Sequence, residues 1–313
     1  MDTIMSLPQA LVHIGVDDGR IAQCRPQLDV ADIAELLDGS QFDEVLVKLR
    51  SVCSLSTEAH RWAAVSLLEQ DAPVRPETQA ARAQAVWLEW ISEHSWQLWS
   101  SAHHILPHCE SRLELLNQWR QQLTSLRNHL PNHRYQPYAE IEPVPMPQLS
   151  DWRDQWRDLV YEPLLEAIEQ QHWADRFITK TVDVQELESG PVHRLHMANV
   201  GMNDRFEALW IELWHAADWI LAPAQNVIPL VEPGVIAAAR GNVSHRCDWT
   251  GGVAAFYDVD FPTGAILESV SRSLNGMAVK DSPEWRQSLS LWLQSYAPCV
   301  EISVEYEQAL VEH

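Results

Sequence analysis

The beginning of the chain alternates apolar and polar positions in two short runs. Residues 10–16 read ALVHIGV and residues 20–25 read RIAQCR, and the DDG between them ends on Gly19. A period of two is typical of strands that bury one face, and a glycine with positive φ suits a tight turn. The pattern therefore predicts a β-hairpin at the N-terminus.

After the hairpin, apolar positions recur at the three- and four-residue spacing of helices. In residues 56–70, STEAHRWAAVSLLEQ, either Ser56 or Thr57 could cap the helix, and Glu58 suits its first turn. The helices that this spacing predicts are residues 29–39, 56–70, 77–105, 109–130, 151–178 and 203–221. Residues 234–261 contain strand-like runs around a TGG turn, and residues 291–313 read as a short helix, a Pro–Cys break, and then a strand or a helix.

Residues 131–148, PNHRYQPYAEIEPVPMPQ, interrupt the helical pattern. Five prolines in this stretch exclude a helix, because each removes a backbone donor and clashes with the preceding turn. We expect a surface loop between two helical halves of a single domain that spans residues 1–313. The predicted fold class is mainly α with small β elements (α+β).

Charge narrows the range of partners. The 22 Lys and Arg against 44 Asp and Glu give a formal net charge of −22, which disfavours binding to nucleic acid or to an anionic membrane. No basic segment precedes a long apolar run, and no stretch reaches the roughly 18 apolar residues that span a bilayer. A cytoplasmic location is the expectation.

Tryptophan and cysteine are the unusual side chains. Fifteen tryptophans against five phenylalanines is an unusual ratio. Trp87, Trp90 and Trp96, like Trp210 and Trp214, fall at or near helical spacing, which favours core filling; the alternative is an exposed aromatic face that docks a protein. The five cysteines form no C-x-x-C pair, so a zinc ribbon or a four-cysteine iron–sulfur site is disfavoured. His104, His108 and Cys109 could form a metal patch, but Pro107 disturbs the helix there, and a helix end with partly exposed histidines is the simpler interpretation.

Several segments, in order along the chain, resemble the large (catalytic) subunits of nickel–iron hydrogenases. Residues 51–62, SVCSLSTEAHRW, are similar to the family's R-x-C-G-x-C-P-x-x-H, with Cys53 at the first cysteine, Ser56 at the second and His60 at the histidine. Residues 86–98, VWLEWISEHSWQL, resemble the long helix that follows in the family, including Glu89 and His94.

The resemblance continues in the last third of the chain. AAARG, residues 237–241, is similar to a family E-A-P-R-G segment and keeps Arg240 and Gly241. DFPTG is similar to a V-P-T turn and supplies Pro262 and Thr263. APCVEISVE is similar to the C-terminal D-P-C-x-x-C-x-x-H, with Cys299 at the first cysteine. The implied fold is a truncated helical bundle of the hydrogenase large-subunit type.

The departures from the family concern its chemistry. In the family, four thiolates hold the nickel–iron cluster, and the second cysteine of each pair bridges the two metals. Those two positions are Ser56 and Ile302 here, a poor soft-metal ligand and none at all. Glu305 also replaces the histidine at which the family is cleaved during maturation. A nickel–iron centre, and therefore catalysis, is not expected, and no nickel is expected.

The pattern that remains resembles the HupK/HoxV-type hydrogenase maturation proteins. This resemblance implies a scaffold that holds an Fe(CN)2(CO) fragment transiently through Cys53 and Cys299 before its transfer to the large-subunit precursor. His60 would support Cys53 or lower its pKa, and Arg240 and Thr263 would contact the cyanides. The residues that the resemblance places around the fragment are Ser56, His60, Arg240, Pro262 and Thr263.

Three points stay open at this stage. The retained cysteines match the terminal nickel ligands of the family, so the iron would have to shift relative to its position in the enzyme. The implied partners, HypC/HypD-type maturation proteins and the large-subunit precursor, have no docking site that the sequence localises. The alternatives are a metal-free chaperone of hydrogenase maturation and a divergent hydrogenase-like oxidoreductase.

Overall fold

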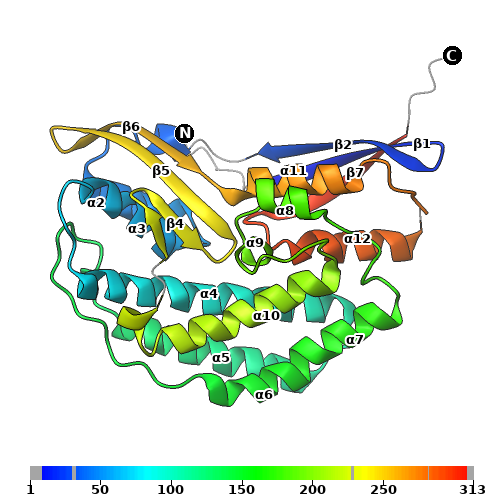
Figure 1. Ribbon diagram of the computed structural model, residues 1–313, viewed down its shortest axis with the longest axis horizontal. Coiled ribbons are helices and arrows are strands. Elements are labelled where there is room, and N and C mark those ends of the chain that lie inside the picture. Colours follow the sequence, from blue (N-terminus) through cyan, green and yellow to red (C-terminus); the bar gives the residue numbers. More distant parts are fainter. Residues whose placement is uncertain (1–8, 30–32, 227–228, 281, 309–313) are drawn as a thin grey trace, which may run out of the picture.

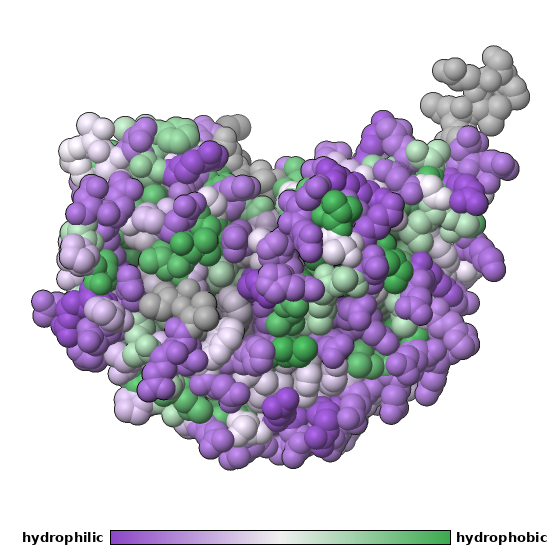
Figure 2. Space-filling view, in the orientation of Figure 1, coloured by the Kyte–Doolittle hydropathy of each residue, from purple (hydrophilic) through white to green (hydrophobic). Residues whose placement is uncertain are grey.

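The structure is a computed structural model that describes residues 9–29, 33–226, 229–280 and 282–308. Figure 1 shows a body of long helices, α4, α5, α7 and α10, with two small sheets on one side of it. Among the described residues, none of the helices combines the length and the apolar character that a bilayer crossing requires. On the face drawn in Figure 2, hydrophilic residues dominate and hydrophobic ones form small patches.

The helical body is built around α4 and α10, which pack along one another. The helices of this body and of its borders are α4 (Pro76–Ile105), α5 (Glu110–His129), α6 (Arg153–Trp156), the π-helical turn Arg157–Tyr161, α7 (Glu162–Gln170), α10 (Met202–Trp219) and α12 (Pro283–Ser295). Short 3-10 turns lie at Ser150–Trp152 and Pro223–Gln225. The predicted helix over residues 151–178 is confirmed as far as Gln170, because helical turns follow one another without a gap from Ser150 to Gln170. Residues 131–148 contain neither helix nor strand, as expected.

The first sheet joins the two ends of the described chain. It has the order β2-β1-β7, with β1 (Gln9–Asp17) antiparallel to β2 (Arg20–Asp29) and parallel to β7 (Glu301–Gln308). The predicted hairpin is confirmed, and the final segment, which the sequence left between strand and helix, is a strand. Figure 1 shows this sheet lying across α11 (Pro262–Leu274), a helix that the sequence pattern did not predict.

The second sheet is an antiparallel meander over the helices that follow the hairpin. Its strands are β3 (Leu230–Glu232), β4 (Val235–Ala238), β5 (Gly241–Thr250) and β6 (Val253–Asp260). The helices beneath or beside it are α1 (Ile33–Leu37), α2 (Phe42–Val52), α3 (Thr57–Leu68), α8 (Thr181–Leu187) and α9 (Pro191–Arg194). The predicted helix over residues 29–39 is α1, although residues 30–32 lie outside the described part.

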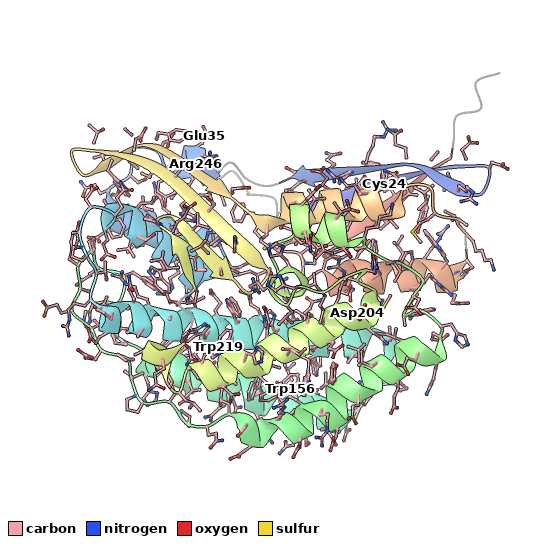
Figure 3. The ribbon with its side chains drawn as sticks, in the orientation of Figure 1. Cys24, Glu35, Trp156, Asp204, Trp219 and Arg246 are labelled. Atoms are coloured by element: carbon pink, nitrogen blue, oxygen red, sulfur yellow. The ribbon has the colours of Figure 1, made fainter. Side chains whose placement is uncertain are left out.

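Tryptophans fill the helical body. Trp119 on α5 is fully buried, contacts the rings of Trp152, Trp156 and Trp214, and donates its indole N–H to Ser95 Oγ at 3.0 Å. Figure 3 shows Trp156 and Trp219 turned into the space between these helices. Core filling is thus the main role of the tryptophans, whereas Trp96 is 43% exposed.

Replacing Trp119 with alanine should lower the free energy of unfolding by about 3–5 kcal/mol, because the cavity left behind loses the contacts of three rings. Trp96→Ala removes the same side chain from an exposed position of α4 and should change the stability by no more than about 0.5 kcal/mol. Urea unfolding followed by circular dichroism measures both. Equal effects of the two substitutions would contradict the packing described here.

Candidate functional site

Two thiols from distant parts of the chain are close enough to interact electrostatically, since a charge on Cys299 raises the pKa of Cys53. Cys53 is the C-cap of α2, with its N–H donating to Leu49 O at 2.8 Å, and Cys299 lies in the turn between α12 and β7. Burial raises the pKa of Cys53 to about 12, together with smaller effects of the charges that Cys299 and Glu89 carry when they ionise. The two sulfurs therefore share one electrostatic environment, in which both thiols are protonated near neutral pH.

Cys299 is surrounded by groups of both signs. Burial raises the pKa of this thiol, the positive charge of Arg240 and the hydroxyl of Thr263 lower it, and the charge of Glu93 raises it. Thr263 Oγ1 is itself buried and makes no hydrogen bond of good geometry. This hydroxyl lies beside the Cys299 thiol and can donate a hydrogen bond. A polar ligand on a metal at Cys299 could accept that hydrogen bond.

Arg240 ties the Cys299 turn to the helical body. Its Nε donates to Glu93 Oε2 at 2.7 Å, and its Nη1 donates in a short hydrogen bond to the carbonyl of Pro298, the residue before Cys299. Both side chains of this ion pair are almost completely buried. Buried ion pairs depend on complete hydrogen bonding, so the position of the turn depends on this pair.

Glu93 also holds the loop that follows Cys53. Its Oε1 accepts the backbone N–H of Ser56 at 2.6 Å and the Ser56 hydroxyl at 3.3 Å. Ser56 has a φ of 53°, a left-handed conformation that its N–H bond to Glu93 stabilises. Thr57 Oγ1 donates in a short hydrogen bond to Cys53 O, so the loop is fastened at both ends. Sequence reasoning missed Glu93; its signal was a second acid four positions after Glu89, on the same face of α4.

The start of α3 is capped from outside the helix. Glu89 accepts the backbone N–H groups of Glu58 at 2.9 Å and Ala59 at 3.2 Å. Ser56 occupies the N-cap position of this helix, one of the two predicted, but its side chain makes no capping hydrogen bond, and a carboxylate of α4 accepts the free amides instead. Burial, followed by the charges of Glu93 and Glu58, raises the pKa of Glu89 well above its usual range. Glu89 therefore favours its neutral form beside Cys53.

His60 belongs to a buried hydrogen-bonded chain of aromatic side chains. Its Nδ1 lies 2.8 Å from His245 Nε2, and His245 Nδ1 lies 2.7 Å from the hydroxyl of Tyr257. Burial lowers the pKa of His60 to about 3, so the ring is neutral. A neutral ring supplies no positive charge that would lower the pKa of Cys53, and His60 is not among the groups that shift the pKa of this thiol. His60 instead packs α3 against β5 and Phe261.

Two of the family-like segments are packed directly against each other. A side chain at Gly241 would approach Pro262 Cβ to 2.7 Å and Ser189 Oγ to 2.8 Å, and its φ is +142°. Pro262 begins α11 and is buried, and Thr263 follows it. Glycine at 241 therefore lets the start of β5 pack against the start of α11. This contact brings Arg240, just before β5, and Thr263, in the first turn of α11, close to Cys299.

The position of the second C-terminal family cysteine is part of the sheet. Ile302 lies in β7 opposite Ala10 of β1, and its side chain packs on the core. Cys24, labelled in Figure 3, lies on β2 beside α11, where Ser271 donates to its carbonyl at 2.8 Å. Within residues 9–308, apart from the segments left undescribed, no group of three or more His, Cys, Asp and Glu is arranged to hold a metal, including the segment with His104 and His108. A metal at Cys53 and Cys299 would have these two protein ligands only.

Two hollows lie next to the residues that position the thiol loops. A cleft of about 700 Å³ is bordered by Ser54, Leu55, Glu89 and Glu93, and a smaller pocket of about 190 Å³ by Leu55, Trp96, Glu93 and Arg240. The cleft thus reaches Glu93, and the smaller pocket reaches both members of the Glu93–Arg240 ion pair, but Cys53 and Cys299 line neither of them.

Gly241→Ala should lower the free energy of unfolding by at least about 1–3 kcal/mol, because alanine is strained at this φ and collides with Pro262. Gly264→Ala, three residues into α11, is the matched control: no atom lies within 4 Å of the added Cβ. There alanine should be neutral or stabilise the helix by up to about 1 kcal/mol. Thermal unfolding of both variants gives the comparison, and a neutral Gly241→Ala would show that the two segments are not in close contact.

The raised pKa of Cys53 predicts a loss of stability at high pH. The thiol ionises near 9.0 in the unfolded chain and near 12 in the folded one, so its contribution is complete below pH 9 and is lost as pH rises towards 12. Cys53→Ala should therefore reduce the slope of unfolding free energy against pH in that window. Urea unfolding at a series of pH values tests this, and parallel profiles of the variant and the parent would contradict a buried, protonated thiol.

The comparisons with known proteins concern the fold. No protein-family model matches this chain, and no curated protein matches it. Solved structures do: the Ni-Fe-Se hydrogenase from D. vulgaris Hildenborough, reduced state, has 11% identity and a TM-score of 0.65, covering 91% of this chain and 94% of that one.

Two further structures are similar to the same extent. An NAD+-reducing [NiFe]-hydrogenase has 13% identity and a TM-score of 0.60, covering 90% of this chain and 93% of that one. An archaeal membrane-bound sulfane sulfur reductase has 12% identity and a TM-score of 0.60, covering 88% and 90%. The fold is therefore an α+β fold of the nickel–iron hydrogenase large-subunit type, as the sequence predicted.

Proposed function

We propose that this protein is a non-catalytic carrier that holds an Fe(CN)2(CO) fragment as cargo during the assembly of a nickel–iron hydrogenase. The observation that supports this most is that Cys53 and Cys299 interact electrostatically within a hydrogenase-like fold. Ser56 and Ile302 stand where the family has its bridging cysteines. Two thiolates are too few for a nickel–iron pair, but they are enough for an iron whose other sites are largely filled by diatomic ligands.

The residues around Cys299 suit the cargo's ligands. Cyanide nitrogens accept hydrogen bonds, and the buried hydroxyl of Thr263 is a donor without a partner of good geometry. Arg240 adds a fixed positive charge next to the same thiol, which offsets the negative charge that thiolates and cyanides introduce. The donor set that is present therefore fits the fragment.

Protonated thiols make the binding of cargo dependent on pH. Burial raises the pKa of both Cys53 and Cys299, so each thiol has to lose its proton when it becomes an iron ligand. Loading is favoured as pH rises, and reprotonation favours release. This balance suits a carrier that transfers the fragment rather than a resident metal centre.

Transfer requires partners at both ends of the process. In this proposal, HypC/HypD-type maturation proteins deliver the fragment and a hydrogenase large-subunit precursor receives it. A hydrogenase-like fold supports the proposal, because a protein shaped like the final acceptor presents the fragment in a similar environment. The route of exchange would be the hollows beside Leu55 and Glu93.

The test is infrared spectroscopy of protein purified anaerobically from a host that expresses the maturation system. We expect bands of iron-bound CO and cyanide in the parent protein, their loss in Cys53→Ala and in Cys299→Ala, and their retention in Cys109→Ala. Cys109 precedes α5, so this variant removes a thiol outside the site.

Each outcome decides between the functions. Bands that persist in both site variants would overturn the ligand assignment. An absence of bands in every preparation would favour a metal-free chaperone. Hydrogen oxidation by metal-loaded protein would favour a divergent oxidoreductase.

A further inference from the structure

The cleft of about 700 Å³ beside the Cys53 loop has an unusual wall. Four arginines line it: Arg50 at the end of α2, Arg61 on α3, Arg127 at the end of α5 and Arg134 in the loop after α5. The amide side chains of Asn128 and Asn132 lie among them. Segments from four parts of the chain thus bring guanidinium and amide donors to one hollow, in a protein whose formal net charge is −22.

The three glutamates that line the cleft already have hydrogen-bond partners within the chain. Glu58 is held by Arg134 through three hydrogen bonds of 2.9–3.0 Å, and Glu93 by Arg240 at 2.7 Å. Glu89 accepts two backbone N–H groups and favours its neutral form. None of the three is available to neutralise the other arginines of the cleft.

Arg50, Arg61 and Arg127 remain as uncompensated cations. In the part of the chain that the structure describes, none of the three forms an ion pair. Arg61 lies over the ring of Tyr135, 4.7 Å from its centre, and its Nε is buried without a hydrogen-bond partner. A guanidinium that lines a cleft without an ion pair is available to an anion from outside the chain.

The cleft also brings like charges close to one another. Burial is the main cause that lowers the pKa of Arg61; the charges of Glu58 and Tyr135 raise it, and the positive charges of Arg134 and Arg50 lower it. Like charges gathered in one hollow destabilise the fold unless a counter-charge joins them. An anion placed among them would relieve this repulsion.

We propose that this cleft is a binding site for a small multivalent oxyanion, a molecule that bears phosphate groups or several carboxylates. Planar guanidinium groups match the geometry of both kinds of oxyanion, and the asparagine amides add neutral donors. The volume falls in the range of small-molecule sites rather than of a protein interface. The site borders the Cys53 loop, so an anion bound here lies next to the thiol region.

This inference goes beyond the carrier function and does not depend on it. The cleft and its arginines are present whether or not iron binds at the thiols. Binding of an anion and retention of an iron fragment can therefore be measured separately, on metal-free and on metal-loaded protein.

The experiment is isothermal titration calorimetry of the metal-free chain with sodium pyrophosphate and, in a second arm, sodium citrate, both at constant ionic strength. We expect one saturable site, with Arg61→Gln and Arg127→Gln each weakening the binding about tenfold or more, as loss of a charge-assisted hydrogen bond does. Tighter binding of pyrophosphate assigns a phosphate ligand, and tighter binding of citrate a polycarboxylate.

Arg246→Gln is the matched control, since it removes the same charge from the strand β5. Figure 3 labels Arg246 on the second sheet, where its side chain pairs with Asp258 at 2.5 Å. Its binding should equal that of the parent. Arg127 is exposed, so Arg127→Gln keeps the test valid even if Arg61→Gln folds poorly.

The absence of saturable binding of both anions would overturn the proposal. If a chain that binds neither small anion binds an acidic peptide, the ligand is a peptide instead. Equal weakening of anion binding in Arg246→Gln and Arg127→Gln would also overturn the proposal. The infrared bands of an iron fragment should persist in Arg127→Gln, so failure here leaves the carrier function untouched.

Discussion

The arrangement of the site depends on one buried carboxylate. Glu93, on the central helix α4, binds the backbone and hydroxyl of Ser56 with one oxygen and Arg240 with the other, and Arg240 in turn binds the carbonyl of Pro298. Removing either ionic partner would leave a charge buried and unpaired, which destabilises far more than the intact pair stabilises. Helix α4 thereby fixes the loop that begins at Cys53 and the turn that contains Cys299, two segments far apart in the sequence.

How far the sequence predicted the fold depended on the range of the interactions. The hairpin and the long helices were predicted because alternation and helical spacing are local patterns. Residues 301–308, EISVEYEQ, are compatible with strand or helix, and only their parallel pairing with β1 decides for a strand. Helix α11 and the end of the preceding predicted helix at Gln170, rather than at residue 178, were missed for the same reason, since tertiary packing overrides local propensity there.

The sequence predicted those parts of the site that depend on residue type and missed those that depend on burial or on distant partners. Cys53 and Cys299 were paired by the resemblance of their segments, and the structure brings the two thiols into one environment. Glu93 was missed, because an acid on a long helix reads as a solvated position until its partners are known. His60 was expected to act on Cys53, yet complete burial keeps its ring neutral, and burial is not visible in a sequence.

The charge balance around the two cysteines bears on how firmly the proposed site would hold a metal. Thiolates at 53 and 299 would add negative charge beside Glu93, in a region where burial already favours the neutral thiols. Arg240 offsets part of that charge, and Glu89 adds little because its raised pKa favours the neutral acid. In the proposed carrier, a metal bound here would have to offset the free energy of ionising two buried thiols. It would therefore be held less firmly than by four thiolates, which is the behaviour that transfer of a fragment requires.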